Sequence, residues 1–166
     1  MILVVMGVCG CGKSTVGEAL AQALDWRFLD ADEFHPPANV AKMASGMPLS
    51  DDDRWPWLDR IADELRAILA RGEHAVLACS ALRQAYRDRL ARAGDVRFVH
   101  LAGDYATIAA RLAGRKHRYM PATLLDSQFA TLEPPADALV VDVALPVERQ
   151  VERVLVAHGL ARAGTS

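Results

Sequence analysis

The segment of this 166-residue sequence with the most specific chemistry is 7–14, which reads GVCGCGKS and is followed by threonine. It fits G-x-x-x-x-G-K-[ST], in which glycines let the loop turn so that backbone N–H groups point at phosphate oxygens. Lys13 can reach the β- and γ-phosphates, and the Ser14 hydroxyl can ligate Mg²⁺. The pattern predicts a nucleoside-triphosphate site. Its predicted residues are Gly7, Val8, Cys9, Gly10, Cys11, Gly12, Lys13, Ser14 and Thr15.

Two aspartates follow the short apolar segment that begins at Arg27. Residues two apart in an extended chain face the same way, so we expect Asp30 and Asp32 to point together into a cleft. One carboxylate could hold Mg²⁺ through water while the other accepts a substrate hydroxyl proton. Asp30 is the predicted metal ligand; the alternative is an aspartate that only caps a turn. His35 could bind substrate or hydrogen-bond within a stiff, proline-rich loop.

A second group of candidates consists of arginines. The aspartates at 51–53 are expected to cap a helix that has Pro56 in its first turn. Arg54 is a cation beside the positive end of a helix, and this unfavourable position suggests that it binds an anion such as a substrate carboxylate. The alternative is a plain surface salt bridge. Arg83 and Arg87 share a helix face and could bind an anion, unless Asp88 offsets their charge.

The segment 111–121 carries four basic side chains around Gly114. It predicts either a solvated basic helix end or a mobile lid, at about 113–122, whose arginines close over the triphosphate. Arg111 and Arg115 are the expected nucleotide contacts, and Arg115 is also predicted to neutralise charge in the transition state.

These candidates must be positioned by strands that alternate with amphipathic helices. Alternation of this kind predicts an α/β fold, a P-loop NTPase-type parallel five-stranded sheet flanked by helices. We expect a single domain over 1–166, with ligands at the carboxyl ends of the strands. The expected strands are 2–6, 27–30, 75–79, 96–101 and 139–143. The expected helices are 14–24, 54–70, 82–93, 104–112, 122–132 and 147–158.

Composition narrows the class of protein. The formal charge of −2 gives no field that would attract nucleic acid or an anionic membrane. No apolar run has the length of a membrane span or of a signal peptide, so we expect a soluble cytoplasmic protein. The three cysteines lack zinc-site spacing. Cys79 is expected in the core, whereas Lys13 and the helix end could lower the thiol pKa of Cys9 and Cys11.

Four strings outside the loop make the chain resemble the gluconate kinase family of small P-loop kinases, relatives of shikimate kinase. They are LDADEFHP, MASGMPLSDDDRWPWL, ACSALRQAYRDRL and DSQFATLEPP. The resemblance covers nearly the whole chain, and the second string is the most specific. It implies ATP-dependent phosphorylation of D-gluconate at its 6-hydroxyl, with Mg²⁺, a movable lid, a substrate-binding insertion at about 33–60 and commonly a homodimer.

The resemblance also implies roles for single residues. Asp32 would orient or deprotonate the substrate hydroxyl, and Arg54 would meet the carboxylate. Further candidates for the polyol pocket are His35, Arg83, Arg87 and Gln128. Cys9 and Cys11 stand where the family usually has serines, and 117–119, HRY, departs from the usual lid sequence.

Two other functions remain open on the sequence. One is a P-loop kinase for another small hydroxy acid, similar to shikimate, or for a nucleotide. The other is a module that senses ATP without turning it over, against which Asp32 argues because a sensor needs no base.

Overall fold

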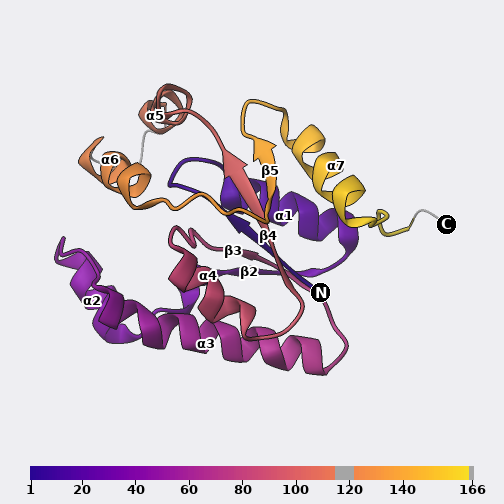
Figure 1. Cartoon of the computed structure of the whole chain (residues 1–166), viewed down its shortest axis with the longest axis horizontal. Coiled ribbons are helices and arrows are strands. Elements are labelled where there is room, and N and C mark those ends of the chain that lie inside the picture. The colour runs from indigo at the N-terminus through magenta and orange to yellow at the C-terminus, as the bar shows by residue number, and fades with distance from the viewer. Residues whose placement is uncertain (115–121, 165–166) are drawn as a thin grey trace.

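The structure, a computed structural model, describes residues 1–114 and 122–164. Its centre is a parallel sheet in the strand order β2-β3-β1-β4-β5 (Figure 1). The strands are β1 (Ile2–Met6), β2 (Arg27–Asp30), β3 (Ala75–Ala78), β4 (Val96–Ala102) and β5 (Leu139–Asp142). The predicted α/β fold with a five-stranded parallel sheet is confirmed.

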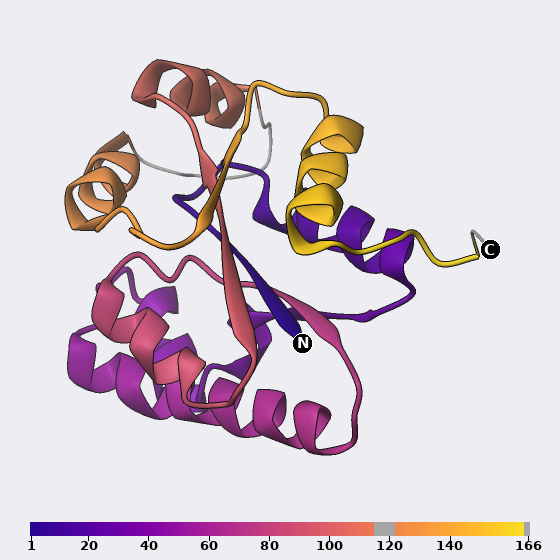
Figure 2. The same ribbon diagram turned by 45° about the vertical axis from the view of Figure 1, so that its right-hand side comes forward.

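The central strand β1 is buried along its whole length because helices cover both faces of the sheet. Its alternate residues enter two separate cores. Leu3 and Val5 pack under α1 (Lys13–Leu24) and α7 (Val147–His158). The other β1 side chains pack under α3 (Asp51–Ala70) and α4 (Gln84–Ala91). Figure 2 shows these two helix pairs on opposite sides of the sheet.

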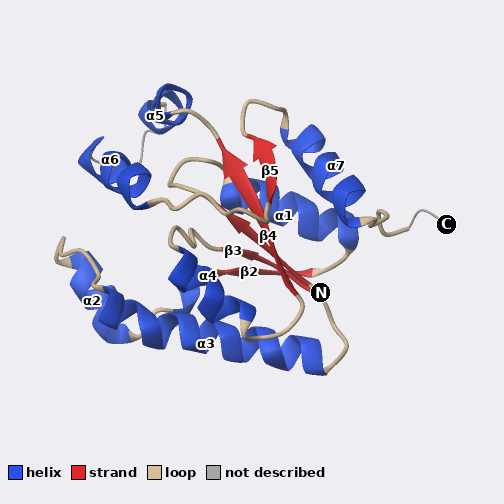
Figure 3. Ribbon diagram, in the orientation of Figure 1, coloured by secondary structure: helices blue, strands red, loops and turns tan. Residues whose placement is uncertain are grey.

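Two further helices lie beyond the carboxyl end of β4 (Figure 3). They are α5 (Tyr105–Ala113) and α6 (Ala122–Thr131), which contact each other. The predicted lid lies between them, and most of it falls outside the described residues.

The segment after β2 contains two elements that the sequence pattern did not predict. A 3₁₀ helix, η1 (Ala31–Phe34), follows the strand directly, and α2 (Pro37–Ala44) comes next with proline in its first turn. Both are short, so hydrophobic periodicity gives little signal for them. They decide where Asp32 and His35 lie.

The predicted start of α3 is wrong by one turn. Ser50 is the N-cap, and its hydroxyl accepts from the Asp53 N–H while the Asp53 carboxylate accepts from the Ser50 N–H. This capping box satisfies N–H groups that the first turn leaves open. The helix therefore begins at Asp51, and Pro56 lies in its second turn rather than its first.

The other expected boundaries agree with the structure or differ from it by one or two residues. The expected helix 82–93 is the shorter α4, because Ala81 adopts a left-handed conformation with φ of 45° and the chain is extended at Arg83. None of the described helices is long and apolar enough to cross a membrane.

Candidate functional site

The loop 7–14 forms a cradle that requires glycine. Gly7, Gly10 and Gly12 have φ values of 150°, 79° and 95°. A Cβ on Gly7 would lie 2.7 Å from the Cys11 Sγ, and one on Gly10 would lie 2.7 Å from Leu112. At Gly12 a Cβ would meet nothing within 4 Å. The loop therefore packs closely against the protein on one side and leaves room at Gly12 on the other.

Helix α1 begins directly behind this cradle. Lys13 and Ser14 belong to its first turn, where backbone N–H groups have no partner within the helix and the helix dipole is positive. The Lys13 Nζ donates to the Val8 carbonyl at 3.0 Å, which folds the side chain over the loop. The predicted phosphate-binding residues thus share one loop and one helix end, a geometry suited to bind a polyphosphate.

Cys9 and Cys11 of the loop are buried free cysteines. Burial is the largest cause of the raised pKa values of Cys9 and Cys11, and it outweighs the opposing charge of Lys13. Burial also raises the pKa of Cys79 to about 12. Burial thus works against the lowering of the loop thiol pKa values that Lys13 causes, and the thiolate is the reactive form of a cysteine.

The helices on either side of the predicted lid contact the phosphate loop. The Cys9 N–H donates to the Gln128 Oε1 of α6 at 2.6 Å, and Leu112 of α5 lies against Gly10. Arg111 donates to the carbonyl of Val143, in the turn that follows β5. The structure therefore places Gln128 against the phosphate loop, where the sequence had suggested a polyol pocket.

Asp30 and Asp32 lie at the carboxyl end of β2, but not on one extended chain. The Asp32 N–H donates to the Asp30 Oδ1 at 3.0 Å, so Asp30 caps η1 while Asp32 belongs to it. The predicted extended pair is wrong because the chain turns into a helix after Asp30. Both aspartates lie at the edge of the sheet where the phosphate loop leaves β1, because β2, β3 and β1 are adjacent parallel strands.

Trp57 organises the next part of the site, and the sequence analysis did not single it out. Its indole N–H donates to the Ala31 carbonyl at 2.7 Å, and its ring stacks on His35 with centroids 4.2 Å apart. The sequence offered a signal for this role, namely a tryptophan seven residues after the cap of a helix. Trp57 thus fixes both ends of the short segment that carries Asp32.

His35 follows the 3₁₀ helix that carries Asp32 and stacks on α3, whose first turn carries Arg54. Burial lowers the pKa of His35; the charge of Asp32 raises this pKa and the charge of Arg54 lowers it further. Asn39 Nδ2 lies 3.3 Å from the His35 Nδ1. An amide NH₂ only donates, so Nδ1 accepts and the ring carries its proton on Nε2. Neutral His35 can therefore donate one hydrogen bond to a hydroxyl.

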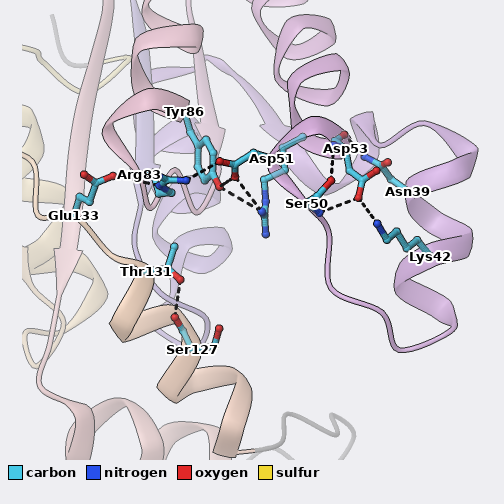
Figure 4. Close-up of polar contacts among 11 residues, drawn as sticks. Asn39, Lys42, Ser50, Asp51, Asp53, Arg83, Tyr86, Ser127, Thr131 and Glu133 are labelled. Carbon is cyan, nitrogen blue, oxygen red and sulfur yellow. Dashed lines mark hydrogen bonds and ion pairs between the residues drawn. The ribbon is translucent and has the colours of Figure 1, made fainter.

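Two arginines converge beyond His35 on a single tyrosine. Asp51 contacts Arg83 Nη1 at 2.6 Å and Arg54 Nη1 at 3.6 Å. The Tyr86 hydroxyl donates to Asp51 at 2.5 Å and accepts from Arg54 at 3.3 Å. We call Asp51, Arg54, Arg83 and Tyr86 the arginine cluster; Figure 4 shows Asp51, Arg83 and Tyr86 meeting there. Tyr86 was not among the predicted site residues, and Asp51 was predicted only as a helix cap.

Arg87 does not join this cluster. Its side chain is buried and donates to the carbonyls of Ala81 and Glu133, each at 2.7 Å, and to the Gln84 amide oxygen. Arg87 thus links α4 to the left-handed turn at Ala81. This placement gives no support to the predicted substrate contact, because its guanidinium is already occupied by the protein.

The predicted roles of Arg115 and of the metal ligands stay predictions. Arg115 lies outside the described residues. Among the described residues, no group of three or more His, Cys, Asp or Glu side chains is placed to hold a metal ion.

The sequence of this chain is similar to those of known proteins. A family model described as an AAA domain matches residues 2–135. The gluconokinase of Gluconobacter oxydans is 51% identical over 137 residues, which cover 81% of this chain and 76% of that protein. The chain belongs to the gluconokinase family. The resemblance noted in the sequence is confirmed.

Solved structures agree with this family. A gluconokinase from Sinorhizobium meliloti aligns with a TM-score of 0.85 at 42% identity, covering 95% of this chain and 90% of that one. Shikimate kinase from Aquifex aeolicus aligns with a TM-score of 0.61 at 17% identity, covering 96% of each chain. At that identity the likeness shows a shared fold and nothing about the substrate.

Proposed function

We propose that this chain transfers the γ-phosphoryl group of ATP to the 6-hydroxyl of D-gluconate. The observation that carries the proposal is the row of groups running from the phosphate loop to the arginine cluster. Strand β2, which leads into Asp32, is separated from β1 and its phosphate loop only by β3. Trp57 ties the segment after Asp32 to α3, whose first turn carries Arg54. A linear sugar acid has a hydroxyl at one end and a carboxylate at the other, which matches the two ends of this row.

The side chains of the row have complementary roles in this proposal. Asp32, which is exposed, accepts the hydroxyl proton, and Arg54 binds the carboxylate with help from Arg83. His35 donates from Nε2 to a hydroxyl between them. Lys13 stabilises the negative charge that develops on the phosphates during phosphoryl transfer.

The residues present fit a magnesium ion bound with the nucleotide. Ser14 and Asp30 offer hard oxygen ligands, and one oxygen of the Asp30 carboxylate remains after it caps η1. When bound there, Mg²⁺ neutralises charge on the β- and γ-phosphates. Ser14 lies in the first turn of α1 and Asp30 is the last residue of β2.

The remaining expectations belong to the same proposal. Arg111 and Arg115 contact the nucleotide from a lid at about 113–122, and Gln128 supports the loop beneath it. The segment at about 33–60 forms the substrate-binding insertion of a single domain. We propose that the protein is cytoplasmic, as the sequence patterns suggest, and that it acts as a homodimer, as the family resemblance implies.

A coupled ADP-release assay tests the proposal. Purified protein with Mg-ATP is offered D-gluconate, shikimate, a nucleoside monophosphate or no acceptor. We expect release that depends on gluconate, and its loss in Lys13→Ala while circular dichroism shows an unchanged fold. Equal release with shikimate or the nucleotide would favour another acceptor, whereas ATP binding without release under any condition would favour a sensor.

A further inference from the structure

The Tyr86 hydroxyl occupies the centre of the arginine cluster. The tyrosine is only 5% exposed, and its ring contacts Trp55 edge-on at 5.8 Å, so its position is fixed by packing. The hydroxyl accepts from Arg54 and donates to Asp51. A hydroxyl with both a donor and an acceptor partner fixes the direction of each bond. Tyr86 therefore determines where the Arg54 guanidinium lies.

Asp51 links the second arginine to the same centre. Its Oδ2 binds Arg83 Nη1, while its Oδ1 receives the Tyr86 hydroxyl and faces Arg54. Both guanidinium groups lie over the Tyr86 ring, at 5.5 Å and 5.8 Å from its centroid. Two cations on one ring repel each other unless a negative group lies between them, and Asp51 supplies that charge.

The usual role of an acidic residue in a first helical turn does not account for Asp51. Asp53 completes the capping box of α3, and Asp52 provides a further negative charge in the same turn. The carboxylate of Asp51 instead turns to α4 and binds Arg83 and Tyr86. The Tyr86 hydrogen bond is also the largest cause of the lowered pKa of Asp51.

The cluster leaves donors for a ligand. Arg54 Nη1 is shared between Tyr86 and Asp51, whereas no acceptor among the described residues engages its Nη2. Arg83 is held from its other side by Glu133, with Nε to Oε1 at 3.5 Å. Arginine recognises a carboxylate well only when its planar fork is correctly oriented, so the groups that orient the fork control affinity.

We propose that Asp51 and Tyr86 are positioning residues that hold Arg54 and Arg83 as a paired receptor for the substrate carboxylate. The pair thereby sets the preference of the site for an acid over a neutral polyol. This inference rests on the proposed function, in which that carboxylate lies at Arg54. It names the two residues that fix the geometry of both arginines.

The test compares Tyr86→Phe and Asp51→Asn with the parent protein. Phenylalanine keeps the buried ring and removes only the hydroxyl. Each variant should raise both the KM and the calorimetric Kd for D-gluconate by roughly tenfold, the value of one hydrogen bond to a charged group. The kcat and the KM for ATP should stay within about twofold, because neither residue touches the phosphates. The double variant should be no worse than the weaker-binding single variant, since the pair acts as a unit.

Asp52→Asn is the matched control. It removes the same charge from the same helical turn without touching an arginine, so its gluconate KM should equal that of the parent. A KM and Kd unchanged in both Tyr86→Phe and Asp51→Asn would overturn the inference. So would tighter gluconate binding in Asp51→Asn, which would make Asp51 a competitor of the substrate, or an equal rise in the KM for ATP, which would indicate a structural defect.

Calorimetry separates this inference from the proposed function. D-Glucitol, which has CH₂OH in place of the carboxylate, should bind the parent and Tyr86→Phe equally weakly. A parent protein that binds gluconate through the cluster without turnover would refute the proposed function and leave the receptor standing. A parent that turns over gluconate while both variants bind it normally would do the reverse. A parent that does not bind gluconate would overturn both.

Discussion

At the scale of single residues, the site depends on which side chains remain available for a ligand. Arg83 and Arg87 are one helical turn apart, yet Arg87 is buried with its guanidinium on protein carbonyls while Arg83 binds Asp51 beside the proposed pocket. Asp30 and Asp32 differ in the same way. Asp30 uses one carboxylate oxygen to cap η1, whereas no described residue hydrogen-bonds the Asp32 side chain. This difference makes Asp32 the better base.

We predict that Asp32→Asn keeps the ATP affinity and the thermal stability but loses most of kcat with gluconate. An amide can still hydrogen-bond the hydroxyl, but it cannot accept the proton. The loss should be on the order of 10²-fold, the low end for general-base catalysis, because a loose phosphoryl-transfer transition state demands little of the base. Steady-state kinetics at saturating Mg-ATP measure it.

Asp30→Asn serves as the comparison for Asp32→Asn. If Asp30 acts through magnesium, its defect should be partly relieved by added Mg²⁺, whereas the Asp32 defect should not. Turnover by Asp32→Asn within a few-fold of the parent, or its rescue by Mg²⁺, would remove Asp32 from the role of base.

At the scale of elements, short helices and caps place the site more than the strands do. The capping box fixes the first residue of α3, and that turn carries both Asp51 and Arg54. Lys42 of α2 binds the Asp53 carboxylate at 2.5 Å, and the Asn39 amide donates to the Asp53 carbonyl at 2.9 Å. Helix α2 is thus docked on the start of α3, which holds the segment from η1 to α3 as a unit.

Ser50→Ala should destabilise the protein because it removes the N-cap hydroxyl of α3. The expected cost is about 1 kcal/mol, which corresponds to a fall in Tm of about 2–4 °C for a domain of this size. Thermal unfolding followed by circular dichroism measures it. Ser45→Ala is the control, since the Ser45 hydroxyl only donates to the Lys42 carbonyl at an exposed position. Equal Tm values for the two variants would show that the cap contributes little.

At the scale of the whole molecule, the sheet buries titratable groups as well as apolar ones. His100 of β4 is buried, and its pKa is lowered first by burial and then by the charge of Arg87. Burial also lowers the pKa of His35. A histidine whose pKa is lower in the folded state binds a proton more readily in the unfolded state. It therefore destabilises the fold once the pH falls below the ordinary pKa of histidine.

We therefore predict that the free energy of unfolding falls as the pH drops through 6.5. In this range the unfolded chain binds more protons than the folded one, and the slope is at most about 1.4 kcal/mol per pH unit for one histidine. Asp51, Asp53 and Asp104 have lowered pKa values, so their stabilising contributions are lost only below about 3.8. Urea unfolding between pH 7.5 and 5.5 measures the slope.

His100→Gln should flatten this dependence, because glutamine does not titrate. A slope of the same size in the parent and in His100→Gln would assign the acid sensitivity to other groups.

The sequence by itself determined the sheet, the phosphate loop and the family. Buried parallel strands are continuous apolar runs, and the loop needs glycine and lysine at fixed spacing, so both are local patterns that a single segment displays. The four family strings identified the substrate class in the same way. Contacts between segments distant in sequence leave no such pattern.

Only the tertiary structure decided which polar side chains of the site meet. Tyr86 and Asp51 are far apart in the sequence and come together because α3 and α4 pack side by side on one face of the sheet. Burial raised the thiol pKa of Cys9, although the neighbouring Lys13 lowers it. Desolvation and contacts between helices depend on the packing of the whole chain, and the identity of any one residue does not reveal them.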